Sequence, residues 1–107
     1  MTTRKPDGRT VTIKGIEYRG VFVSLAIFER GVMLEKKLDE AKAAFDANPN
    51  DGTETEYDRV WGDYCSCFLF EEEARVRSEL SRHELGLQEA IELRSFFGRL
   101  LGLTTQT

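Results

Sequence analysis

The sequence lacks the residue sets from which most enzymes and metal sites are built. Its 107 residues include one histidine, two cysteines, two prolines and one tryptophan. A structural zinc site usually takes four Cys or His ligands in paired spacings, and a secreted disulfide framework takes more cysteines than two. Neither a glycine-elbow serine nor a phosphate-cradling loop is found in the sequence. We therefore expect no cofactor, no bound metal and no enzymatic activity.

Long apolar runs are also missing. No run approaches the roughly 18–20 residues that cross a bilayer, and residues 1–8 are polar with no signal-peptide stretch behind them. Cys65 and Cys67 are one residue apart, where a disulfide would be strained, so we expect both to be reduced. These features predict a cytoplasmic protein with no membrane partner.

The charges that are present are unevenly spread along an acidic chain of net charge −4. Residues 1–20 carry five basic and two acidic side chains, whereas residues 46–63 carry six acidic side chains against Arg59 alone. A duplex-binding domain usually gathers Lys and Arg on one face to contact phosphates. No such cluster follows residue 20, so nucleic acid is not the expected partner.

Composition and length predict one domain with polar ends. At 40% hydrophobic and 32% charged residues the chain has an ordinary globular composition. We expect a flexible basic arm at residues 1–8, a single globular domain at 9–103 and a polar tail at 104–107. Residues 10–13 and 16–19 alternate apolar and polar, which predicts a β-hairpin that pairs Ile13 with Ile16 and Val11 with Tyr18.

Three helices are expected after this hairpin. The apolar run at residues 21–28 fits either a strand or a helix start. Further along, apolar residues recur at spacings of seven, four, three and four, which places them on one helix face: Ile27, Leu34, Leu38, Ala41 and Phe45. This helix should end near Ala47, with Gly31 as a weak point. Turn formers at 48–52 and a capping box of Thr53 and Glu56 predict a long second helix, which ends at a left-handed Gly86. A third helix covers 87–101.

The predicted fold is therefore an α-dominated α+β domain. It comprises an N-terminal β-hairpin, a long antiparallel helical hairpin and a shorter third helix.

Two local patterns invite a functional interpretation. Asp46, Asn48 and Asn50 resemble the first five positions of an EF-hand calcium loop, but Gly52 comes one place late and Tyr57 stands where the bidentate carboxylate belongs. We therefore expect a solvated, capped turn. The only histidine, His83, continues a ladder of alternating charge at intervals of four with Glu71, Arg75 and Glu79, which is typical of a solvated helix face.

The strongest functional signal is a surplus of apolar surface. Residues 60–70 are apolar over about half of the helix circumference and residues 87–101 over about two-thirds, whereas one packing face needs only about 100°. We therefore expect a small protein–protein interaction module, a homodimer that regulates, adapts or inhibits a larger partner. The side chains expected either to contact the partner or to form the core are Trp61, Tyr64, Phe96, Phe97 and Leu100. The size, acidity and lack of motifs also fit accessory proteins of phages and mobile elements.

A DNA-binding regulator is the alternative. The side chains that would contact phosphates are Arg4, Lys5, Arg9, Lys14 and Arg19. A strand pair before a helix that breaks at Gly31 and Val32 would suggest a helix-turn-helix. Its second helix would carry more acidic side chains than a groove-reading helix favours.

Overall fold

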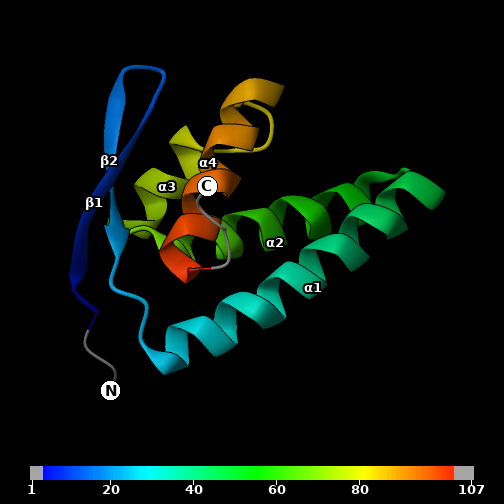
Figure 1. Cartoon of the computed structure of the whole chain (residues 1–107). Coiled ribbons are helices and arrows are strands. Elements are labelled where there is room, and N and C mark those ends of the chain that lie inside the picture. The colour runs from blue at the N-terminus through cyan, green and yellow to red at the C-terminus, as the bar shows by residue number, and fades with distance from the viewer. Residues whose placement is uncertain (1–3, 103–107) are drawn as a thin grey trace.

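The computed structural model describes residues 4–102 and has the predicted α-dominated α+β fold (Figure 1). The elements in chain order are β1 (Pro6–Ile13), β2 (Ile16–Val21), α1 (Leu25–Ala47), α2 (Asp51–Phe68), α3 (Glu73–Glu79) and α4 (Leu87–Leu101). Figure 1 shows the β-hairpin beside α3 and α4, while α1 and α2 run antiparallel and carry their connecting turn away from the hairpin. None of the helices within residues 4–102 has the length and apolar character needed to cross a membrane.

The hairpin has the predicted register but starts earlier than expected. Ile13 pairs with Ile16 and Val11 with Tyr18, across a turn in which Lys14 and Gly15 have φ values of 53° and 78°. Two consecutive positive φ values match the twist of a two-residue hairpin.

The described part of the expected flexible arm is attached to the fold. Strand β1 already begins at Pro6, and the Lys5 carbonyl accepts a hydrogen bond of 2.7 Å from the Phe22 amide. The Arg4 guanidinium donates to the carbonyls of Ser66 and Leu69. The free arm predicted for residues 1–8 is therefore wrong for residues 4–8. Residues 1–3 and 103–107, with the predicted polar tail, lie outside the described residues.

Helix α1 resolves the ambiguous apolar run and has no break. Val21 ends β2, and α1 begins at Leu25 after Ser24, whose hydroxyl accepts a hydrogen bond of 3.2 Å from the Ile27 amide. The helix passes through Gly31 without interruption, so the helix-turn-helix break is wrong. A Cβ at Gly31 would lie 2.8 Å from Cε1 of Phe68, so the glycine lets α1 approach α2 closely.

The capping box of α2 lies three residues before its predicted place. The Asn50 side-chain oxygen accepts from the Thr53 amide at 3.0 Å, and the Asn50 amide donates to the Thr53 hydroxyl at 3.1 Å. Thr53 is thus the third residue of the helix rather than its cap. Asparagine is among the best N-cap residues, so the first available cap starts the helix.

The predicted long second helix is wrong because tertiary pairing divides it. Leu69 leaves α2 in an extended conformation and bridges to Gly20 of β2, and the Phe70 amide donates to the Arg19 carbonyl at 2.8 Å. Leu69 is fully buried there. Burial and a sheet-edge hydrogen bond outweigh a weak local helix preference.

The predicted left-handed glycine is at a different position. Gly86 has φ −76° and caps the N-terminus of α4, so its predicted left-handed role at the end of the second helix is wrong. The left-handed position belongs to Gly102, with φ 73°, at the end of α4. Helix α4 itself has the predicted bounds.

An aromatic cluster joins the helices in the core. The rings of Tyr64, Phe68 and Phe97 lie 5.0 to 5.3 Å apart between centroids. The indole of Trp61 donates to the Leu80 carbonyl at 2.7 Å, which ties the end of α3 to α2. Buried aromatic pairs at these separations stabilise a core beyond their burial alone.

Candidate functional surfaces and a histidine cluster

The apolar side chains considered as partner contacts are core residues. Their exposed fractions lie between 0% and 6% for Trp61, Tyr64, Phe96, Phe97 and Leu100. The wide apolar faces from which they come are covered within one chain, because α2 packs on α1 and α3 while α4 packs on the hairpin. In this conformation they offer a partner almost no surface, so an interaction site on this chain would have to use other residues.

The basic residues of the DNA-binding alternative already contact other groups of the same chain. Arg19 donates through its amide at 2.7 Å and through its guanidinium at 3.1 Å to the Glu71 carboxylate, and these bonds hold the pKa of Glu71 below its usual range. Arg9 bonds to Asp7 and to the Arg99 carbonyl at 3.0 Å.

Three further cations complete that set. Arg4 donates to backbone carbonyls and Lys14 donates to the carbonyl of Glu84. The Lys5 ammonium lies 5.0 Å from the ring centroid of Phe22. Counterion release at phosphates requires cations that are free to contact DNA, and four of these five already bond to protein oxygens: Arg4, Arg9, Lys14 and Arg19. These bonds do not favour the DNA-binding alternative.

Exposed apolar side chains gather instead at the start of α1. We call Phe22, Leu25, Val32 and Met33 the outer α1 patch; Leu25 is 73% exposed and the other three are about half exposed. The buried residues of α1 include Ile27, Leu34 and Leu38, on the opposite side of the helix. The only sequence signal for this patch is that its members fall outside the periodic apolar face.

A second apolar surface borders α4. A groove of about 260 Å³, the α4 groove, has Tyr57, Trp61, Leu85 and Ala90 among its lining residues, and Lys42, Arg82 and Arg94 also line it. Leu87 and Ile91 line it as well and are 79% and 49% exposed. The sequence predicted surplus apolar surface on this helix, and Leu87 and Ile91 are the large apolar side chains of α4 that remain exposed.

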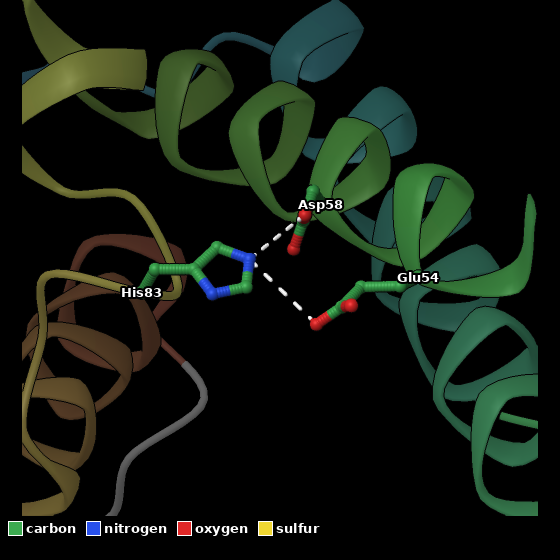
Figure 2. A group of neighbouring side chains, drawn as sticks. All are labelled: Glu54, Asp58 and His83. Atoms are coloured by element: carbon green, nitrogen blue, oxygen red, sulfur yellow. Dashed lines mark hydrogen bonds and ion pairs between the residues drawn. The ribbon is translucent and has the colours of Figure 1, made fainter. Parts of the chain in front are cut away.

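The histidine lies in a cluster that local spacing did not predict. Figure 2 shows His83, on the turn after α3, facing Glu54 and Asp58 on α2. Its Nε2 atom lies 2.9 Å from Oδ2 of Asp58 and 3.8 Å from Oε2 of Glu54. Burial alone would raise the pKa of Asp58, but hydrogen bonds from His83 and Arg82 lower it overall.

His83 does not continue the predicted ladder of charge. Arg75 pairs with Glu71 at 3.1 Å and with Glu79 at 3.0 Å, as the ladder requires. Helix α3 ends at Glu79, so the turn carries His83 across to α2 instead. Only the i, i+4 spacing of Glu54 and Asp58 could have marked them as a pair. No local pattern links them to His83, which follows Asp58 by 25 positions.

The cysteines stay apart from this cluster. Cys65 and Cys67 are free and buried, as expected. Burial raises the pKa of both thiols, and the Cys67 sulfur lies 3.9 Å from the Ile27 carbonyl oxygen. Buried thiols with raised pKa values are unreactive, so both act as small apolar core residues.

Comparison of the chain with protein-family models, with curated proteins and with solved structures finds no match. The functional interpretation therefore depends on the outer α1 patch, the α4 groove and the His83 cluster themselves.

Proposed function

We propose that the protein is a small, non-enzymatic protein–protein interaction module that forms an antiparallel homodimer through the outer α1 patch. The observation that carries this proposal is the exposure of Leu25, Val32 and Met33 on a helix whose opposite face is already buried. Exposed apolar side chains beyond the needs of the core are typical of an interaction site.

The periodicity of α1 places three residues of the outer α1 patch on the half of the helix that faces away from the core. At 100° per residue, Leu25 and Val32 lie within about 20° of each other and Met33 about 80° further round. The buried Leu34 lies on the other side of the same helix. The apolar residues can therefore contact a second helix without disturbing the core.

The charges beside the patch favour a second copy of this chain as the occupant. Glu29 and Lys36 lie on the same outer side of α1 and are exposed. Within residues 4–102 neither has an ion-pair partner. An antiparallel copy with its two-fold axis between Val32 and Met33 brings Glu29 of each chain opposite Lys36 of the other. This pairing supplies two ion pairs around an apolar centre.

The area that a stable dimer buries requires the proposed contact to extend beyond α1. A stable dimer buries about 800 Å² on each partner, usually as an apolar centre with a polar rim. Phe22 extends the apolar centre toward β2, and the charged residues of α1 supply the rim. Lys5, whose ammonium covers the Phe22 ring, lies at that edge.

The α4 groove remains open in such a dimer, since it lies beside the C-terminal half of α1. Its apolar lining with Lys42 and Arg94 suits an apolar side chain flanked by carboxylates. We propose this groove as the surface at which the dimer contacts a larger partner, in the manner of a regulator, adaptor or inhibitor.

Sedimentation equilibrium tests the dimer directly. We expect the wild-type chain to approach the mass of a dimer as its concentration rises to about 100 µM, in the range of weak specific association. Val32→Glu should give a monomer, because it places two carboxylates, one from each copy, in the apolar centre of the contact, where burying an unpaired charge is costly.

Ile91→Glu is the matched control, because Ile91 and Val32 are both 49% exposed and only Val32 belongs to the outer α1 patch. This variant should remain dimeric. A wild-type chain that is monomeric throughout the range, or a Val32→Glu variant that stays dimeric, contradicts the proposal.

A further inference from the structure

We infer that Glu54, Asp58 and His83 form a binding site for a divalent transition-metal ion of the zinc type, within a single chain. The inference does not depend on the proposed dimer, since all three side chains belong to one chain and lie outside the outer α1 patch. Figure 2 shows the three side chains directed toward one another from α2 and from the turn after α3.

The distances between the ligand atoms suit a tetrahedral ion. Metal–ligand bonds of about 2.0–2.1 Å in a tetrahedron separate neighbouring ligand atoms by about 3.3 Å. Nε2 of His83 lies 2.9 Å from Oδ2 of Asp58 and 3.8 Å from Oε2 of Glu54, and one ligand atom from each residue falls within a 4.8 Å span. Both distances from His83 therefore lie within about half an ångström of the tetrahedral separation, and the two carboxylate oxygens are no more than 4.8 Å apart.

Arg82 holds the carboxylates from the outer side. Its Nε donates to Oδ1 of Asp58 at 2.8 Å, which leaves Oδ2 directed at the histidine. Its Nη2 donates to Oε2 of Glu54 at 2.7 Å, and the second lone pair of this oxygen, which lies 3.8 Å from Nε2 of His83, remains for the ion. The guanidinium also stacks over Tyr57, 4.3 Å from the ring centroid. Metal-binding carboxylates are commonly oriented by such outer hydrogen bonds.

The charges of the site favour binding of a cation with moderate affinity. Two carboxylates and one guanidinium leave a net charge of −1 when His83 is neutral, which attracts a divalent ion. The nearby guanidinium reduces that attraction, and three protein ligands leave the fourth position to water. An imidazole ligand selects zinc-type ions over Mg²⁺ and Ca²⁺, which prefer sites built from oxygen alone.

Binding at this site would join α2 to the turn that borders the α4 groove. Arg82 and Leu85 from that turn both line the groove. A bound ion would therefore fix one wall of the surface assigned to the larger partner.

Calorimetric titration of the full chain with Zn²⁺ tests the inference. We expect saturable binding of one ion per chain, with no comparable heat from Mg²⁺ or Ca²⁺. His83→Ala and Asp58→Asn should each weaken Zn²⁺ binding at least tenfold, roughly the minimum loss seen when a supporting residue of a metal site is removed.

Glu56→Gln is the matched control. It removes a carboxylate that also pairs with an arginine on α2 but does not reach His83. Zn²⁺ affinity should stay within about twofold of wild type, far from the tenfold loss expected for a ligand. Absence of saturable binding in the wild type overturns the inference, and so does equal binding by His83→Ala.

Two further measurements keep the result interpretable. Co²⁺ should give the visible absorption of a tetrahedral site in the wild type and lose it in His83→Ala, and circular dichroism checks that each variant is folded. Val32→Glu should bind Zn²⁺ like the wild type, which separates this site from the dimer. Zn²⁺ that binds Val32→Glu only as its sedimentation mass increases would place the ligands on two chains and overturn the inference.

Discussion

The apolar face of α4 and the outer face of α1 both carry large apolar side chains, but other elements cover only the face of α4. Phe97 on α4 is fully buried, whereas Leu25 on α1 is 73% exposed. Both helices carry more apolar residues than one packing face needs. The share of a helix surface that is apolar therefore does not locate an interface, because the elements that cover it come from distant parts of the chain.

The coverage of α4 comes from the β-hairpin. Gly20 of β2 lies so close to α4 that a Cβ there would be 2.9 Å from both Leu100 and Phe96. Arg9 of β1 donates to the Arg99 carbonyl at 3.0 Å. Within residues 4–102, no comparable element packs on Leu25.

The two faces should differ most in how much stability the protein loses when one large apolar side chain is replaced by alanine. Phe97→Ala should lower the free energy of unfolding by about 3–5 kcal/mol, the usual range for a buried phenylalanine. Its ring lies 5.0 Å from Phe68 and 5.3 Å from Tyr64, and both contacts are lost. Chemical denaturation followed by circular dichroism measures the change.

Leu25→Ala provides the reference for that measurement. An exposed side chain away from special backbone features should change stability by about 0.5 kcal/mol or less. The denaturation should be compared at concentrations where the dimer is dissociated. A similar loss for both variants would remove the distinction between the two faces.

A smaller loss of stability should show that the inner side of α1 is tightly packed. Gly31→Ala places a methyl group against the buried ring of Phe68, and overpacking costs about 1–3 kcal/mol. This cost should exceed the gain of about 1 kcal/mol from better helix propensity. We expect net destabilisation in thermal or chemical unfolding.

Gly62→Ala is the control for Gly31→Ala. Both glycines are buried within helices, but the added methyl at Gly62 meets the end of the Arg77 side chain. Arg77 is one-third exposed and can move at the expense of its ion pairs with Asp63 and Glu73, so this variant should lose less stability than Gly31→Ala. If Gly31→Ala were as stable as Gly62→Ala, the inner face of α1 would not be tightly packed.

Local sequence patterns predicted the elements of the fold but not the point where α2 ends. The alternation of residues 10–13 and 16–19 determined the hairpin register, and the spacing of Ile27, Leu34 and Leu38 identified α1. The end of α2 at Phe68 depends on pairing between Leu69 and Gly20, which lie 49 positions apart. No local preference reports such a contact.

The candidate sites were less predictable than the fold for the same reason. Trp61, Tyr64 and Phe96 fitted both a core and an interface, and only their coverage decided between these roles. His83 joined Glu54 and Asp58 because α3 ended early and the following turn reversed toward α2. These outcomes depend on tertiary packing, which can override local patterns.

The measurement that tests the antiparallel dimer most directly is a charge exchange on the outer face of α1. Glu29→Lys and Lys36→Glu should each lower the dimer fraction in sedimentation equilibrium, because each places like charges opposite one another across the two-fold axis. The double variant Glu29→Lys with Lys36→Glu should restore the dimer. A double variant no more dimeric than the single variants, or single variants that associate like the wild type, would contradict the pairing.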